Sequence, residues 1–282
     1  MRAHLLPLLL LAVTSCTASL DLDRFRKEEA KTSTNVVASV TYIDFRFIAR
    51  SMLPHVGEDM ELRLVDKANT VQGKAVYANV NRTEFKIECP KFVPKSGGPF
   101  RVDFWADHNF SGKYDGIVGG INDKDHAWRR ELVEPYPEDV QIVDGGFVLN
   151  FLHDTAFVDI FTDLEGNAIS GEEELLPFQL SLKGIEAYTE KSIEVRVADK
   201  GSGRLVGLHR RSVVRAPYVA EVTGVLDSQT PYEVSVFVDA DANDEYGPGD
   251  PSWKVELVSS EIGIVADLDL ATAAQAPLGD VR

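Results

Sequence analysis

Residues 60–67 read Met60-Glu61-Leu62-Arg63-Leu64-Val65-Asp66-Lys67, a run in which apolar and polar side chains alternate. This period of two indicates a β-strand with one apolar face and one polar face. The same pattern returns without a gap at 193–200, which read Ile193-Glu194-Val195-Arg196-Val197-Ala198-Asp199-Lys200. The chain therefore contains one strand signal twice, more than a hundred residues apart.

Three further blocks recur in the same order, so the sequence predicts an internal duplication. Phe45-Arg46-Phe47 matches Phe178-Gln179-Leu180, residues 100–107 match 232–239, and residues 128–132 match 253–257. Because four blocks in one order are hard to obtain by chance, we expect the two halves to share one fold.

The rest of the chain carries the signals of short strands separated by turns. In the first half strands are expected near 36–50, 59–66, 74–80, 84–88, 99–106, 127–133 and 146–152, and in the second half near 175–183, 192–199, 204–210, 217–224, 232–238, 252–258 and 261–268. Short strands with regular turn signals are typical of β-sandwiches. We therefore predict an all-β protein of two tandem immunoglobulin-like antiparallel β-sandwich domains.

The sequence also predicts where these domains begin and end. We expect a signal peptide at 1–15, a polar tether at 16–35, the first sandwich at 36–161, a linker at 162–172 and the second sandwich at 173–282. The linker lies between the last strand expected in the first half and the first strand expected in the second half.

Composition and charge exclude one class of partner. Hydrophobic residues make up 44% of the chain and charged residues 26%, which is enough apolar material to fold. The formal net charge is −16 at pH 7, and the acidic residues are spread along the chain. A field of this sign repels phosphate backbones, so nucleic acid is excluded as a partner, and it attracts cations such as calcium.

The N-terminus has the pattern of an export signal. Met1 and Arg2 precede an apolar run from Leu5 to Ala12, which is shorter than the roughly 20 residues needed to cross a bilayer. The run ends in Val13-Thr14-Ser15-Cys16, which resembles the lipobox of bacterial lipoprotein signal peptides. The resemblance implies that Cys16 becomes the new N-terminus and carries acyl chains, which anchor the protein to the membrane.

The anchor also predicts a location in the cell envelope. Thr17 follows the cysteine, and by analogy with lipoprotein sorting the absence of aspartate there favours the outer membrane of a Gram-negative bacterium. The alternative is an ordinary secretory signal that ends near a cysteine. The chain has only two cysteines, so acylation of Cys16 leaves Cys89 without a disulfide partner. We expect Cys89 to be a small apolar residue buried in a strand.

An acidic loop follows the repeated strand near 232–238 in the second half. Its candidate ligands are Asp239, Asp241, Asn243, Glu245 through its backbone carbonyl, and Asp250. They occupy loop positions 1, 3, 5, 7 and 12, which is the ligand spacing of calcium-binding loops. The loop resembles those of dockerin modules and EF-hands, with Asp244 in place of the glycine at position 6 and Asp250 in place of the glutamate at position 12.

The first half contains a matching loop, with candidate ligands Asp107, Asn109, Ser111, Asp115 and Asp125. Gly112 stands at position 6, and an insertion at 116–124 delays the closing acid to Asp123 or Asp125. Because the spacing is kept in both halves, we expect both loops to bind calcium and to be stiffened by it. The alternative is a solvated hairpin whose Asp and Asn side chains form Asx turns.

Three histidines in loops of the first half suggest a different metal. His55, His108 and His126 are all absent from the corresponding positions of the second half, and the strand count puts their loops at one end of the fold. Three imidazoles with Asp107 or Asp125 to orient them suit zinc or copper. The alternative is that His126 hydrogen-bonds its own loop while the other two face solvent. His153 and His209 have no partner that the sequence identifies.

The function predicted from these features is that of a lipid-anchored cell-envelope protein with a non-catalytic binding or surface-structural role, serving an unknown protein or glycan ligand. Motifs of nucleophilic and zinc-protease catalysis and phosphate-binding glycine loops are absent from the sequence. One alternative is a copper- or zinc-binding protein or metalloenzyme that uses the three histidines. Another is a carbohydrate-binding module with Trp105, Trp128 and Tyr114 as stacking surfaces.

Overall fold

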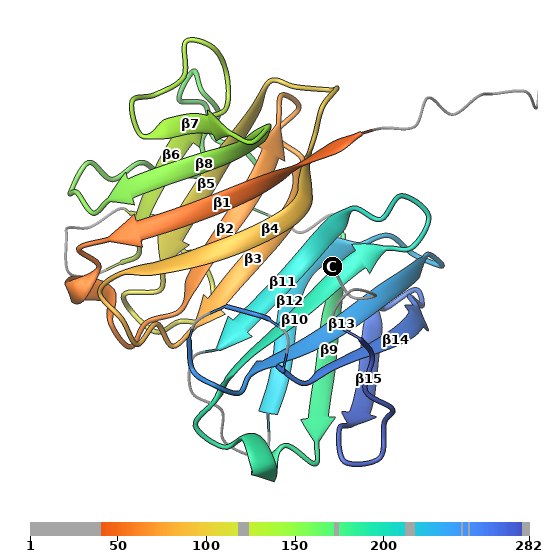
Figure 1. Ribbon diagram of the computed structural model, residues 1–282. Helices are drawn as coiled ribbons and strands as arrows, with labels where there is room; N and C mark the ends of the chain where they lie inside the picture. The colour runs from red at the N-terminus through yellow and green to blue at the C-terminus, as the bar shows by residue number, and fades with distance from the viewer. Residues whose placement is uncertain are drawn as a thin grey trace, which may run out of the picture. The chain divides into compact units, whose positions relative to one another are not determined.

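A computed structural model describes residues 41–117, 124–171, 175–211, 218–243, 245–247 and 249–277. Within these ranges the chain forms fifteen strands and two single-turn 3₁₀ helices, and the all-β prediction is confirmed (Figure 1). The predicted signal peptide, Cys16 and the tether lie outside the described residues. Among the described residues, no helix has the length and apolar character needed to span a membrane.

The strands follow the predicted order in both halves. In the first half they are β1 (Tyr42–Arg50), β2 (Met60–Asp66), β3 (Val71–Ala78), β4 (Phe85–Pro94), β5 (Phe100–Ala106), β6 (His126–Glu131), β7 (Val140–Val143) and β8 (Gly146–Leu152). In the second half they are β9 (Leu176–Lys183), β10 (Ser192–Asp199), β11 (Leu205–Arg211), β12 (Tyr218–Leu226), β13 (Pro231–Asp239), β14 (Ser252–Val258) and β15 (Ile264–Asp269). The 3₁₀ turns are η1 (Leu53–His55) and η2 (Glu186–Tyr188).

The prediction missed β7, a short strand at the edge of its sheet. It is joined to β8 by Asp144 and Gly145, whose φ angles are 52° and 80°. Two central residues with positive φ form the turn that matches the twist of a β-hairpin, and Asp-Gly is a preferred sequence for it. That dipeptide was the available signal for β7.

The two halves pair their strands in the same order. In the first half β2 lies between β3 and β5, and β5 pairs with β6; in the second half β10 lies between β11 and β13, and β13 pairs with β14. The first strand of each half, β1 or β9, pairs with the last, β8 or β15, in parallel. These two pairings and the one between β3 and β11 are parallel. The other pairings among the described strands are antiparallel, so the predicted antiparallel arrangement holds only in part.

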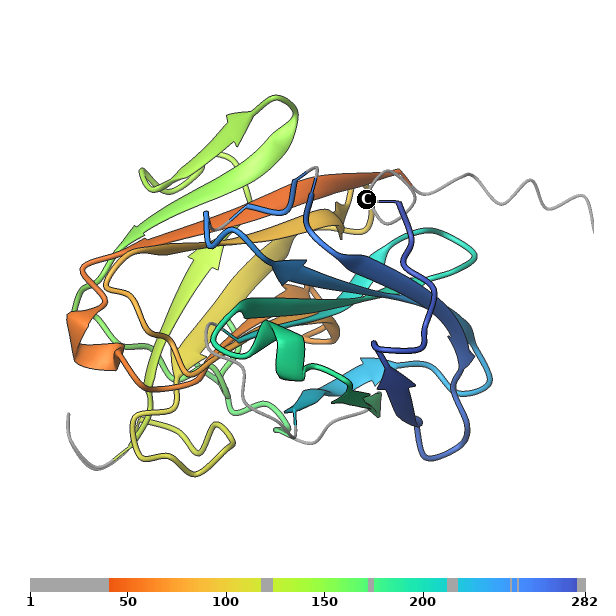
Figure 2. The ribbon, with the colours of Figure 1, turned by 60° about the horizontal axis from the view of Figure 1, so that its bottom comes forward.

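One sheet runs through both halves. Its order is β14-β13-β10-β11-β3-β2-β5-β6, and the halves meet where β11 and β3 pair in parallel from Lys74↔Gly207 to Ala78↔Arg211. A four-stranded sheet, β4-β1-β8-β7, and a three-stranded sheet, β12-β9-β15, complete the fold (Figures 1 and 2). The halves are therefore continuous in backbone hydrogen bonding, in addition to the chain that connects them.

The two cores lie on opposite faces of this long sheet. Paired residues form rows that run across β10, β11, β3 and β2, in that order. One row contains Arg196, Leu208, Ala75 and Leu62, and the next row contains Val195, His209, Val76 and Glu61. Neighbours within a row point to the same face, and adjacent rows point to opposite faces. Leu62 belongs to the first core and Val195 to the second, so each half buries the face that the other half leaves to polar residues.

The aromatic residues at alternating positions in the strands fill these cores. Phe45, Phe47, Phe104, Phe178 and Tyr232 are buried as expected from their spacing, while Tyr42 is half-buried. Cys89 is buried in the first core, and burial raises the pKa of its thiol. This residue is a small apolar core residue, as its strand position predicts.

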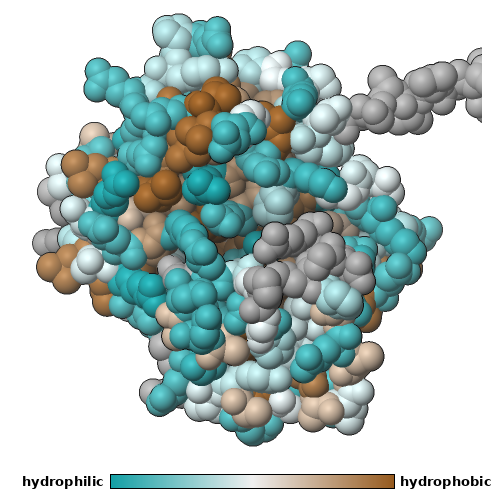
Figure 3. Space-filling view, in the orientation of Figure 1, coloured by the Kyte–Doolittle hydropathy of each residue, from teal (hydrophilic) through white to brown (hydrophobic). Residues whose placement is uncertain are grey.

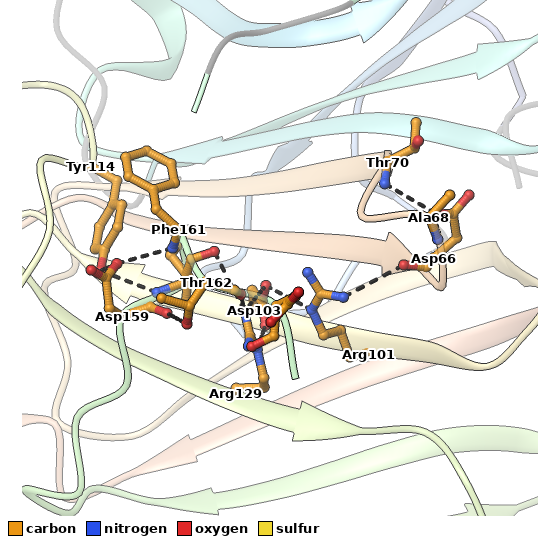
Figure 4. Close-up of polar contacts among 12 residues, drawn as sticks. Asp66, Ala68, Thr70, Arg101, Asp103, Tyr114, Arg129, Asp159, Phe161 and Thr162 are labelled. Carbon is orange, nitrogen blue, oxygen red and sulfur yellow. Dashed lines mark hydrogen bonds and ion pairs between the residues drawn. The ribbon is translucent and has the colours of Figure 1, made fainter. Parts of the chain in front are cut away.

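A buried ion-pair network fastens the segment after β8 to the long sheet (Figure 4). Arg129 forms two contacts with Asp103, from Nε to Oδ1 at 2.6 Å and from Nη2 to Oδ2 at 2.9 Å. Its guanidinium also donates to the carbonyls of Thr162 at 2.8 Å and Asp163 at 3.2 Å. The start of the predicted linker is thus held by a charged group that is itself almost fully buried.

His209 lies in β11, at the junction of the halves, and makes the fold sensitive to acid. Its Nδ1 lies 2.8 Å from the Tyr218 hydroxyl. Burial, with a smaller contribution from the charge of Arg211, lowers the pKa of His209 from 6.5 to about 4. The unfolded chain therefore binds a proton at higher pH than the folded chain does.

This difference predicts a loss of stability on acidification. Between pH 6.5 and pH 4 the unfolded state is favoured by proton uptake at His209. At about pH 5 the loss amounts to about 2 kcal/mol. Urea unfolding at several pH values should show this loss in the wild type and a smaller one in His209→Gln. Parallel pH profiles for the two proteins would contradict the assignment.

The Arg129 network predicts a large effect of one substitution. Arg129→Met leaves Asp103 with fewer buried partners and frees the carbonyls of Thr162 and Asp163, which should cost about 3 to 5 kcal/mol of unfolding free energy. Arg130→Met is the matched control, because Arg130 pairs with Asp139 and Asp154 near the surface and should cost about 1 kcal/mol or less. Urea unfolding of both variants measures the difference, and equal costs would contradict it.

Candidate metal centres

The predicted loops of the first half meet at one end of the strands. Ala106, the last residue of β5, pairs with Met60 on one side and with His126 on the other. In the other sheet, β1 and β8 run in parallel and end side by side, and the His153 N–H donates to the Arg50 carbonyl at 3.0 Å. The segments that carry histidines therefore come from both layers of the first half.

The structure brings His55, His108 and His126 together. One ring nitrogen of each lies within 4.8 Å of the others. The rings of His108 and His126 stack with centroids 4.4 Å apart, and the centroids of His55 and His126 are 5.1 Å apart. His55 and His126 are buried, whereas the side chain of His108 is 26% exposed. The three histidines thus form a cluster that reaches the surface at His108.

Glu58 holds two of these rings. Its Oε2 lies 2.7 Å from Nδ1 of His55, and its Oε1 lies 2.8 Å from Nδ1 of His108. Burial raises the pKa of Glu58, but the hydrogen bonds and charges of the two histidines outweigh burial, and the net pKa is lowered. An ionised carboxylate only accepts hydrogen bonds, so both Nδ1 atoms carry protons and both Nε2 atoms face away from Glu58.

Glu58 replaces the orienting residue that the sequence analysis expected. Asp107 and Asp125 were expected to orient the histidines, but Asp107 accepts from the N–H groups of Ser111 and Gly112, and Asp125 accepts from that of Asp115. The sequence signal that could have identified Glu58 is its spacing from His55, which lies three residues earlier at the end of a 3₁₀ turn.

His153 is a second residue that the sequence analysis missed. Its Nε2 lies 3.0 Å from Nε2 of His55. Burial, followed by the charge of His55, lowers the pKa of His153. The position of His153 depends on the parallel pairing of β1 and β8, and the sequence carries no local signal for that pairing.

The aromatic residues around the loops are buried. Trp128 is 0% exposed, and its Nε1 donates to the Asp154 carbonyl at 3.2 Å. Trp105 and Tyr114 are each 4% exposed, and the Tyr114 hydroxyl donates to Asp159 at 2.9 Å. These side chains cannot stack on a sugar in this structure, so the hypothesis of a carbohydrate site built on them is wrong.

In the second half, three of the predicted calcium ligands come together. A carboxylate oxygen of Asp239, one of Asp241 and one of Asp250 lie within 4.8 Å of one another. The Asn243 side chain donates to Asp241 at 2.9 Å, whereas the Glu245 carboxylate turns to Lys86, with its Oε1 2.9 Å from Nζ. Residue 244, at the position where glycine was expected, lies outside the described residues.

The loop of the first half is closed by hydrogen bonds among the predicted ligands. The Asp107 carboxylate accepts from the N–H groups of Ser111 and Gly112 at 2.9 and 2.8 Å, and the Asn109 side chain donates to Asp115 at 2.9 Å. Asp115 and Asp125 each keep one buried carboxylate oxygen with no hydrogen-bond partner in the part of the chain described. Burial, with the charges of Asp115 and Asp107, raises the pKa of Asp125 to about 6.

The surface shows where another molecule could bind. The face drawn in Figure 3 is mainly hydrophilic, with a hydrophobic area over the sheet that contains β7 and β8. Ile142 and Val143 on β7 are 48% and 43% exposed, and β7 is the edge strand of that sheet. An apolar edge strand is a surface on which proteins make contacts.

Comparisons with known proteins give weak structural likeness. No family model and no curated protein matches the chain. Among solved structures, the tip fimbrial protein Mfa3 from Porphyromonas gingivalis is similar with a TM-score of 0.24 and 8% identity over 79% of this chain and 84% of that one. The fimbrial anchor protein Mfa2 from the same organism has a TM-score of 0.20 and 14% identity over 81% and 88%. Scores of this size assign neither fold nor function.

Proposed function

We propose that this chain is a lipid-anchored protein of the cell envelope with a non-catalytic binding or surface-structural role, and that calcium stiffens its acidic loops. The observation that carries the calcium proposal is the convergence of Asp239, Asp241 and Asp250 in the loop after β13. Carboxylate oxygens at this spacing are the ligands that calcium takes in extracellular modules.

The loop after β5 supports the same proposal by its place in the fold. It follows the strand that corresponds to β13 in the pairing order, and it contains two buried carboxylate oxygens without a hydrogen-bond partner among the described residues. Buried charged oxygens are costly unless a donor or a cation compensates them. A bound calcium would compensate the carboxylates of Asp107, Asp115 and Asp125.

The anchoring proposal depends on the N-terminal sequence. A charged start, a short apolar run and a cysteine at its end direct a chain to export and acylation in bacterial lipoproteins, which this sequence resembles. The outer membrane of a Gram-negative cell is the proposed location. The exposed β7 edge is the proposed contact for a protein partner.

Calcium should raise the melting temperature of the purified protein. At a concentration a hundred times Kd, a ligand that binds only the native state stabilises it by about 2.7 kcal/mol, which corresponds to a rise in Tm of about 5 to 10 °C. The double variant Asp107→Asn and Asp239→Asn should lose this rise. Glu245→Gln is the matched control, because its carboxylate binds Lys86 and not the acidic cluster.

The calcium proposal is wrong if the wild type melts at one temperature in calcium and in EDTA. It is also wrong if the double variant, folded by circular dichroism, keeps the full calcium-dependent rise.

Cys16→Ser should release the protein from the membrane fraction of a Gram-negative host. The wild type should carry the added mass of acyl chains on its N-terminal peptide, because two or more chains hold a protein stably at a bilayer. Fractionation and mass spectrometry of that peptide measure both effects. An unmodified N-terminal peptide in the wild type would contradict the anchor.

A further inference from the structure

We infer that His55, His108 and His126 bind one transition-metal ion of the zinc class, with Glu58 as the positioning residue. This inference does not depend on the calcium proposal, since its ligands are nitrogens and not carboxylates.

The donor set selects the metal. Imidazole nitrogen is a preferred ligand of zinc and copper, whereas calcium takes oxygen ligands. A carboxylate that accepts a hydrogen bond from one ring nitrogen of a histidine leaves the other nitrogen to face a metal, and this arrangement surrounds most metal-bound histidines. Glu58 makes this contact with both His55 and His108, one through each oxygen.

The distances are close to those of a bound site. Zinc–nitrogen bonds of about 2.0–2.1 Å in a tetrahedron keep the nitrogens about 3.3 Å apart. The three histidines each offer a nitrogen within 4.8 Å of the others. The rings of His108 and His126 are stacked at an interplanar angle of 15°, so His108, the exposed member of the cluster, has to turn out of the stack for both nitrogens to face one ion.

The other two rings are fixed in place by packing. The rings of His126 and Phe157 stack with centroids 4.1 Å apart, and His55 meets Trp128 edge-on with ring centroids 5.5 Å apart. His126 also lies in β6, where it pairs with Ala106. Rings held in this way lose little freedom when an ion binds, which favours binding.

Simple packing does not explain the cluster. Buried imidazoles are polar, and apolar side chains would fill the same space at lower cost. Two histidines nevertheless contact one carboxylate at this end of the strands, and His126 and His153 lie against His55. An ion at the three nitrogens would join η1, the loop after β5 and the start of β6. The three-nitrogen group does not include His153, whose Nε2 lies 3.0 Å from Nε2 of His55.

The test measures zinc uptake by the full chain, purified without a histidine tag, stripped with EDTA and loaded with zinc chloride. Inductively coupled plasma mass spectrometry should give about one zinc per chain, and each of His55→Ala, His108→Ala and His126→Ala should lose it. Glu58→Gln should lower the zinc affinity about 10- to 100-fold, because the amide keeps only one acceptor oxygen. The matched control is His209→Gln, which removes a histidine outside the cluster and should keep the zinc.

A spectroscopic measurement on the wild type does not depend on the variants folding. Cobalt(II) in place of zinc should give the visible absorption of a tetrahedral site, and zinc should protect His108 from diethyl pyrocarbonate. No zinc uptake by the wild type, or equal uptake by the folded histidine variants, would overturn the inference. The calcium-dependent rise in Tm should be kept in the histidine variants, so the two proposals can fail separately.

Discussion

The parallel pairing of β3 with β11 is the constraint on which the rest of the architecture depends. It turns two small sheets into one sheet of eight strands and sets the rows that place the two cores on opposite faces. Lys74 lies in this junction with a fully buried side chain, and its Nζ is 3.8 Å from Glu61 of β2 and 3.4 Å from Thr223 of β12. A carboxylate of the first half therefore compensates the charge at the junction, and a hydroxyl of the second half accepts a hydrogen bond from it.

Much of the fold could be predicted from local signals. The alternation at 60–67 and 193–200 predicts β2 and β10, and the loop spacing predicts that Asp239, Asp241 and Asp250 come together. The convergence of His55, His108 and His126 could be predicted by counting strand directions, because that count gives the end of the fold at which each loop lies. Features that depend on the sequence of a single strand or loop could thus be predicted.

Features that depend on pairing between strands far apart in the sequence could not be predicted. No residue of β3 or β11 marks them as partners, and parallel neighbours need no shared turn. His153 was missed for the same reason. Alternation also suggests that the polar face of β5 is exposed, yet Arg101 and Asp103 are buried because the face of the long sheet that carries them is covered by the segment after β8. Trp105 lies on the same face and packs in a small buried cluster with Tyr114, Ala127 and Ile160, so a polar residue in this strand does not indicate contact with water.

The junction of the halves has a consequence for how the chain reaches its folded state. During synthesis β3 is made before β11, so the edge of β3 lacks its partner until residues 205–211 are available. Unpaired strand edges recruit other chains, and slow long-range pairing extends the time during which they can do so. Residues 71–78 therefore keep unpaired backbone N–H and C=O groups on one edge until residues 205–211 pair with them.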